Sequence, residues 1–144
     1  MMRVVILFLI LFTSGIQLLF GQYKLDVHIQ GVLSPKGSIA IAIYTDETDF
    51  LDFEEAYRYY RISAKEQHSH VFSDLKEGTY AIAAFYDANS NDQLDTNILG
   101  IPKEALGTSG NSKNKFGPPK FKNCKFYLNS NQAIEIELKK PFDK

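Results

Sequence analysis

The chain alternates apolar and polar side chains along several short stretches, which predicts β-strands because successive residues of a strand point to opposite faces. Residues 23–30 and 134–139 alternate cleanly, so each is expected to form a strand with one buried face. Residues 39–44 place isoleucine on one face and mostly small residues on the other, and residues 79–86 are largely apolar on both faces. We expect these two strands to be covered on both sides, as central strands are.

The segments between these strands predict the remaining elements. A turn over residues 34–37 would join the first two strands into a β-hairpin. Residues 46–60 carry aromatic side chains at helical spacing and predict a short helix, whereas residues 121–128 predict another strand and residues 107–120 a surface loop. The chain is therefore expected to be all-β: an antiparallel Ig-like or prealbumin-like β-sandwich of about seven strands with one short helical insertion.

The first residues have the composition of a secretory signal peptide rather than of a folded domain. Arg3 precedes an apolar run over residues 4–12, and a softer segment ends at Gly21. The run is short for a transmembrane helix, which needs about 20 residues, although an uncleaved anchor is the alternative. We expect residues 1–21 to be removed and residues 22–144 to form one domain, exported to the bacterial periplasm, the outer surface or the medium, with no membrane association after cleavage.

Composition gives no reason to expect a nucleic-acid partner and excludes stabilisation by an internal disulfide bond. The formal net charge is −1, which gives no reason to expect nucleic acid as a partner. Cys124 is the only cysteine, so no internal disulfide can form and the fold must rest on its hydrophobic core. The residues on either side of Cys124 alternate in polarity, which predicts a buried strand position for it.

Oxygen-bearing side chains recur at every second position just after the most apolar strand. Asp87, Asn89 and Asn91 occupy positions 1, 3 and 5 of a loop, the spacing with which a curled loop surrounds a hard cation. The backbone carbonyl of Gln93 and the carboxylate of Asp95 would add further oxygens at positions 7 and 9. Calcium takes about six to eight oxygen ligands, so the loop predicts a calcium site.

Two positions of this loop depart from the pattern of calcium loops. Asp92 stands at position 6, where glycine usually makes a sharp turn, and Ile98 stands at position 12, where a bidentate glutamate is expected. Asp tolerates the left-handed backbone conformation better than most residues, so the turn remains feasible. Glu104 could fold back across residues 100–102 and supply the missing carboxylate. A site with so few acids should bind calcium weakly, at about 10⁻⁴–10⁻³ M.

A calcium-free loop is the alternative, because Asn and Asp side chains also stabilise turns by bonding their own backbone. A second alternative is a hydrolase built on Asp87, Asp95 and Glu104 with His70. The sequence contains no nucleophile elbow and no metalloprotease helix motif, which favours a non-catalytic protein.

A third alternative is a carbohydrate- or peptide-binding module that uses exposed aromatic side chains. Tyr57, Tyr59 and Tyr60 are the candidate contact residues, and the partner would be a cell-surface protein or glycan. Exposure of these tyrosines would support this alternative, and burial would exclude it.

Residues 77–81, 87–97, 100–104 and 117–121 together resemble the bacterial domain-of-unknown-function family 2141. The resemblance implies a small exported protein without an assigned activity. The chain departs from the family pattern at Tyr86, where a histidine often precedes the aspartate, and at Asp92, where glycine is usual. The resemblance therefore gives no support to catalysis.

A looser similarity links residues 87–101 to the prealbumin-like B repeats of bacterial surface adhesins. This similarity implies a sandwich with the loop at one end. It implies that Asp87, Asn89, Asn91 and Asp95 are calcium ligands. It does not explain which residue replaces the glutamate expected at position 12.

Overall fold

The computed structural model describes residues 21–66, 68–111 and 117–140. The signal peptide predicted for residues 1–21 lies outside these ranges, apart from Gly21. In the described part of the chain, no helix is both long enough and apolar enough to cross a membrane.

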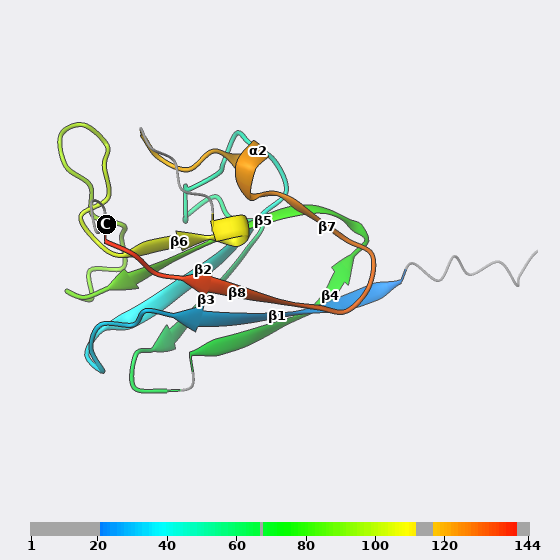
Figure 1. The fold of residues 1–144 in the computed structure, drawn as a ribbon, viewed down its shortest axis with the longest axis horizontal. Coiled ribbons are helices and arrows are strands. Elements are labelled where there is room, and N and C mark those ends of the chain that lie inside the picture. The colour runs from blue at the N-terminus through cyan, green and yellow to red at the C-terminus, as the bar shows by residue number, and fades with distance from the viewer. Residues whose placement is uncertain (1–20, 67, 112–116, 141–144) are drawn as a thin grey trace, which may run out of the picture.

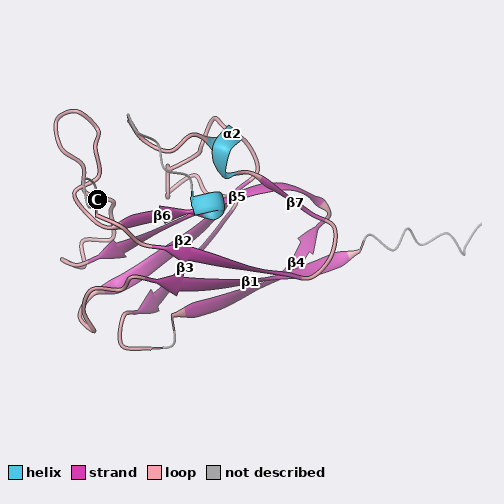
Figure 2. Cartoon of the chain, in the orientation of Figure 1, coloured by secondary structure: helices cyan, strands magenta, loops and turns pink. Residues whose placement is uncertain are grey.

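Eight strands in the described residues form two layers, which confirms the predicted all-β fold (Figures 1 and 2). The first sheet has the order β4-β1-β8, in which β1 runs antiparallel to β4 and parallel to β8. Its strands are β1 (Gln22–Gln30), β4 (Ser69–Lys76) and β8 (Gln132–Glu137). The second sheet has the order β3-β2-β5-β6, and β7 pairs with the start of β5. Its strands are β2 (Ser38–Tyr44), β3 (Arg58–Ser63), β5 (Gly78–Asp87), β6 (Leu106–Thr108) and β7 (Phe126–Leu128).

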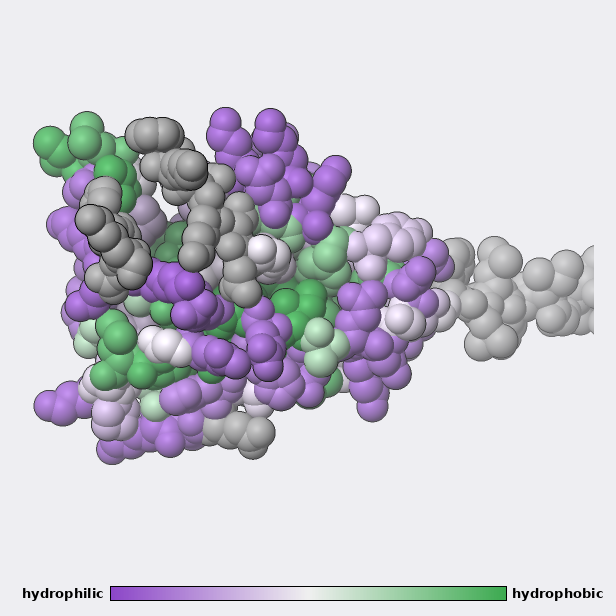
Figure 3. Space-filling view, viewed as in Figure 1, coloured by the Kyte–Doolittle hydropathy of each residue, from purple (hydrophilic) through white to green (hydrophobic). Residues whose placement is uncertain are grey.

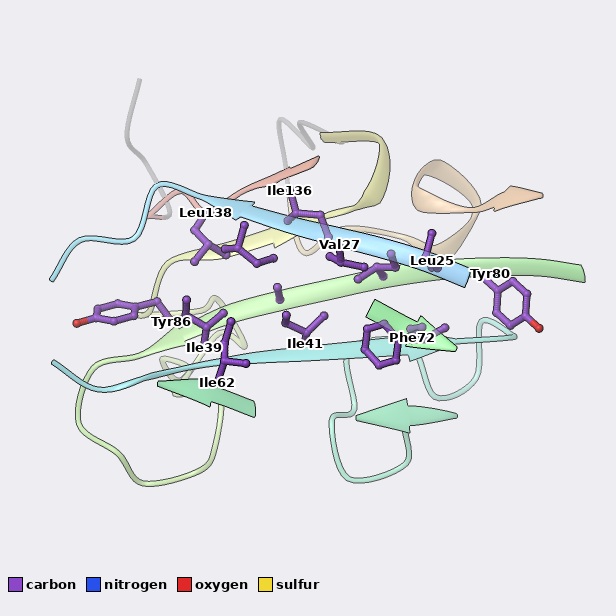
Figure 4. Packing of buried hydrophobic residues seen from close by; sticks show 14 of the residues in the cluster. Leu25, Val27, Ile39, Ile41, Ile62, Phe72, Tyr80, Tyr86, Ile136 and Leu138 are labelled. Carbon is purple, nitrogen blue, oxygen red and sulfur yellow. The ribbon is translucent and has the colours of Figure 1, made fainter. Parts of the chain in front are cut away.

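The main core fills the space between the two sheets (Figure 4). Leu25 and Val27 of β1 face Ile39 and Ile41 of β2, and all four side chains are fully buried. Burying an aliphatic side chain of this size stabilises the fold by about 1.5–3 kcal/mol. The alternation in the sequence therefore identified the inward face of β1 and of β2.

The two strands expected to be covered on both faces are the central strands of the second sheet. Every residue of β5 from Tyr80 to Asp87 is buried, and so are the last six residues of β2. A second cluster covers their outer face, with Tyr44 and Ala83 packed against Phe121 and Cys124. The predicted burial of Cys124 is thus confirmed, but the residue ends a one-turn helix rather than lying in the predicted strand.

The predicted hairpin between the first two strands is wrong. β1 and β2 lie in different sheets, and the connection over residues 31–37 crosses from one layer to the other. Gly31 has a φ of 78° at the point where the chain leaves β1, a conformation that glycine adopts at little cost. Alternation reports which face of a strand is buried, but it does not report the partner strand.

The helix predicted for residues 46–60 is also wrong, because turns and bends occupy most of this stretch before β3 begins. Phe50 and Phe53 pack edge-on against Tyr44, so they attach the connection to the outer face of the second sheet. Leu51 has a φ of 76°, which a continuous α-helix does not contain.

The helical elements lie elsewhere, as a 3₁₀ turn η1 (Ser109–Asn111) and a one-turn helix α2 (Phe121–Cys124). Of residues 121–128, predicted as one strand, only the last three form a strand, β7. The first two residues of the predicted loop 107–120 belong to β6. Phe121 and Cys124 are three positions apart and both buried, which is the spacing of one helical face.

One side of the sandwich is closed by a close backbone approach. A Cβ atom on Gly107 would lie 2.6 Å from the carbonyl oxygen of Glu137, so only glycine lets β6 approach β8 this closely. The backbones of Leu106 and Lys139 hydrogen-bond at the same place. On the opposite side, β3 and β4 lie in different sheets and only side chains join them: Arg58 Nη1 donates to the carbonyl of Ser73 at 3.3 Å, and Tyr60 stacks on His70.

Candidate functional site

The Asp87 loop, defined here as residues 87–105, leaves the end of β5 and returns to β6. Because β5 and β6 are antiparallel neighbours, the two ends of the loop meet, and the Tyr86 N–H donates to the carbonyl of Ala105. The loop lies at one end of the sandwich (Figure 1). This topology places Glu104 beside the start of the loop.

Asp87 is fully buried, at 0% exposure, and both of its carboxylate oxygens have partners. Oδ2 accepts hydrogen bonds from Arg61 Nη1 at 2.7 Å and from the Asp92 N–H at 3.0 Å. Oδ1 accepts the Asn91 N–H at 3.3 Å. A buried carboxylate needs such compensation because desolvation penalises its charge.

The sequence reasoning did not identify Arg61. Its Nη1 atom also donates to Ser38 Oγ at 2.5 Å and lies 3.3 Å from Asp92 Oδ1. The sheet order brings it there, because Arg61 pairs with Ala40 of β2 while Ser38 pairs with Asp87 of β5. An arginine on an alternating edge strand gives no signal of such a role.

Glu104 follows the turn at residues 100–102, and its carboxylate lies beside the backbone of Ala88 and Asp95. Its side chain is 9% exposed, and its two oxygens accept the N–H groups of Ala88 and Asp95 at 3.1 and 3.2 Å. Burial raises the pKa of Glu104, these two hydrogen bonds lower it, and the nearby charge of Asp87 raises it further. The carboxylate thus holds the two ends of the loop together.

The side chains of Asn89 and Asn91 converge on Asp95. Asn89 Nδ2 donates to Asp95 Oδ2 at 2.8 Å, and Asn91 Nδ2 donates to Asp95 Oδ1 at 3.0 Å. The Oδ1 atoms of the two asparagines accept the N–H groups of Asn91 and Gln93, as in turns stabilised by Asn side chains.

The two departures from the calcium-loop pattern have different structural outcomes. Asp92 has a φ of 66°, so position 6 does adopt the left-handed conformation that glycine favours. Ile98 is 102% exposed, and Leu99 beside it is also exposed. The side chain at position 12 is therefore in solvent rather than in the hydrogen-bonded part of the loop. Apolar surface is visible at the end of the molecule where this loop lies (Figure 3).

The side chains of the six predicted ligands form two groups, which backbone N–H groups of Asn91 and Asp95 connect. Asp87 and Glu104 face the backbone and Arg61, whereas Asn89, Asn91 and Asp95 face one another, and Gln93 contributes its N–H to the second group. Over the described ranges, no three His, Cys, Asp or Glu side chains are grouped so that they could hold a metal ion. Amide oxygens would have to complete any calcium site here.

The candidate base of the hydrolase alternative lies on a different element. His70 of β4 stacks on Tyr60 of β3, with ring centroids 3.5 Å apart. Burial lowers the pKa of His70. Its neighbour is therefore an aromatic ring rather than a carboxylate of the Asp87 loop.

The fold and the loop define a β-sandwich protein with an internally hydrogen-bonded polar loop at the end of its central strand. A family model described as "Uncharacterized protein conserved in bacteria (DUF2141)" matches residues 27–136. The chain belongs to this family, as the resemblance had indicated. No curated protein and no solved structure matches it.

Proposed function

We propose that this protein is an exported, non-catalytic β-sandwich module whose Asp87 loop binds calcium weakly. The observation that carries the proposal is the convergence of Asn89 and Asn91 on the carboxylate of Asp95. Carboxylate and amide oxygens are ligands that calcium prefers. Calcium would serve a structural role by crosslinking the loop.

In this proposal the residues of the site have different roles. Asp95 would supply the carboxylate, Asn89 and Asn91 would turn their amide oxygens toward it, and Gln93 would add its backbone carbonyl. Asp87 and Glu104 would hold the loop backbone in place, as their hydrogen bonds to Asp92 and Ala88 do. Because Arg61 is paired with Asp87, its positive charge favours a cation position near Asp95 instead. A site with one carboxylate and otherwise neutral oxygens should have a calcium dissociation constant of about 10⁻³ M, at the weak end of the range for extracellular calcium modules.

Calorimetric titration of residues 22–144 with calcium chloride tests this proposal. At about 10 mM calcium, a dissociation constant near 1 mM would stabilise the fold by about 1.4 kcal/mol. Asp95→Asn should abolish both the heat and the stabilisation. Asp74→Asn is the matched control, because Asp74 is an exposed aspartate on β4. Absence of heat and of thermal stabilisation in the wild-type protein would exclude calcium binding.

The burial of two acids supports a non-catalytic role. A hydrolytic carboxylate must reach its substrate, whereas Asp87 is fully buried and Glu104 nearly so. Both side chains are also engaged by backbone N–H groups. These acids are therefore better suited to supporting the loop than to proton transfer.

A specific observation favours the binding module as a second candidate function. Tyr57, Tyr59 and Tyr60 are 48%, 42% and 43% exposed, so the condition that would have excluded this alternative is not met. Tyrosines that keep this much exposure on an edge strand are suited to contact a glycan or a peptide.

A further inference from the structure

β3 is an edge strand of the second sheet and pairs with β2 on one side only. Its side chains Arg58 and Tyr60 contact β4 of the other sheet, but no strand pairs with its outer edge among the described residues. β4, the edge strand on the same side of the sandwich, contains a bulge opposite Lys24, where Asp74 has a φ of 61°. Bulges protect an edge because they interrupt the regular row of donors and acceptors. β3 has no such interruption, so its outer edge can accept another strand.

The connection that leads into β3 carries a strong negative charge. Residues 45–57, here called the acidic connection, contain six carboxylates and no lysine or arginine. Within the described residues, none of the six is in an ion pair. A partner segment beside β3 would therefore be favoured by positive charge.

A hollow of about 220 Å³ opens beside the start of β3. Its walls include Asp46, Asp49 and Glu55 together with Tyr44 and Tyr57. Tyr44 is 1% exposed, and its hydroxyl has no hydrogen-bond partner among the described residues. An ammonium or guanidinium group in this hollow would meet three carboxylates and bring donors toward that hydroxyl.

Tyr57, just before β3, and Tyr59 within β3 already lie close to cations. The guanidinium of Arg58 lies 5.9 Å from the ring centre of Tyr57, and that of Arg61 lies 5.7 Å from the ring centre of Tyr59. Exposed tyrosine faces offer the same interaction to lysine or arginine side chains of a partner.

We propose that the outer edge of β3 binds an extended, lysine- or arginine-rich peptide segment as an added strand, with one cationic side chain in the hollow between Tyr44 and Tyr57. Backbone hydrogen bonds would provide the affinity, and the acidic connection would select the basic partner. This inference rests on the second candidate function, the binding module, and it does not depend on calcium.

Fluorescence anisotropy with a labelled peptide of alternating lysine and threonine tests the proposal in residues 22–144. Two probes of the same length separate the contributions: one has glutamate in place of lysine, and one has lysine but methylated backbone nitrogens. At about 50 mM salt, the lysine peptide should bind and the other two should bind at least about tenfold more weakly. Equal binding of the methylated peptide would overturn strand addition, and equal binding of the acidic peptide would overturn the charge preference.

Variants of the protein locate the site. The triple variant Glu47→Gln, Glu54→Gln, Glu55→Gln should weaken binding at least about fivefold at low salt. The control replaces Glu77, Glu135 and Glu137 by glutamine, away from β3, and should change binding by less than about twofold. Thermal melts of both variants check that the fold is retained. Equal loss in both variants would show unspecific attraction and overturn the proposed site.

Amide hydrogen exchange completes the test. The bound peptide should protect amides of β3, while amides of β8 should be unaffected. Protection of β3 without peptide, together with a dimer in sedimentation, would assign this edge to a second copy of the chain and overturn the proposal. If glycans bind but the peptide does not, the edge proposal fails while the binding module stands. Repeating the titration with and without calcium keeps the result separate from the calcium site.

Discussion

The guanidinium of Arg61 lies 2.7 Å from the carboxylate of Asp87, although β2 separates their two strands in the sheet. The arginine reaches across the end of β2, where it also contacts Ser38. A residue of the edge strand thereby neutralises the fully buried acid from which the Asp87 loop starts. The stability of the loop is therefore coupled to β3.

Replacing Arg61 should destabilise the protein strongly. Arg61→Met would leave the buried Asp87 carboxylate without a counter-charge, and the free energy of unfolding should fall by about 3–5 kcal/mol. Urea denaturation measures this change. The double variant Arg61→Met, Asp87→Asn should recover part of the loss, because the unpaired charge is then gone. A loss below about 1 kcal/mol in Arg61→Met would show that the pair contributes little.

Glu104→Gln should loosen the Asp87 loop. The glutamine offers one acceptor oxygen for two N–H groups, those of Ala88 and Asp95, so the cost should be about 1–3 kcal/mol. Because the pKa of Glu104 is raised in the folded state, its contribution to stability is fully present below the unfolded pKa and is lost as pH rises through the folded pKa. The difference in the free energy of unfolding between the wild type and Glu104→Gln should therefore be greatest in acid. Unfolding curves across this pH range measure it, and an advantage that grows with pH would contradict the assignment.

Substitutions of Asp92 test whether position 6 of the loop requires a left-handed backbone. Its φ of 66° is left-handed, so Asp92→Gly should be better tolerated than Asp92→Ala, by about 1 kcal/mol. Both variants remove the exposed contact with Arg61 equally, so their difference isolates the backbone conformation. Thermal unfolding of the two proteins provides the comparison, and equal stability would mean that the turn is not strained.

His70 should make stability depend on pH in mild acid. Burial lowers the pKa of His70 in the folded state. Its contribution is therefore fully present above the unfolded pKa of about 6.5 and is lost as pH falls through the folded pKa. His70→Phe keeps a ring against Tyr60 and should lose less stability between neutral and mildly acidic pH. His28→Gln, an exposed histidine of β1 in contact with Asp26, controls for loss of an imidazole.

The proposed export of the chain makes a direct prediction about its N-terminus. If residues 1–21 are a signal peptide, the mature protein should begin at Gln22, the first residue of β1. N-terminal sequencing of the protein from the periplasm or the medium tests this. Recovery of the full-length chain in the membrane fraction would favour the uncleaved anchor instead.

The sequence by itself determined the class of the fold and the inward face of most strands. Alternation in residues 23–30 and continuous apolarity in residues 79–86 are properties of single strands, and both match the burial in β1 and β5. Local chemistry likewise located the Asp87 loop and its left-handed turn at Asp92. These features depend on neighbouring residues only, so they can be inferred without knowing which strands pair.

Only the tertiary structure decided which strands pair and which contacts each polar side chain of the loop makes. It placed β1 and β2 in different sheets and brought Arg61 to Asp87 across β2. It also separated the ligands predicted for one cation into two acids that hold the backbone and a group around Asp95. The physical reason is that a buried carboxylate must be compensated by the donors that the fold brings to it, and Arg61, the charged donor to Asp87, is 26 residues away in the sequence.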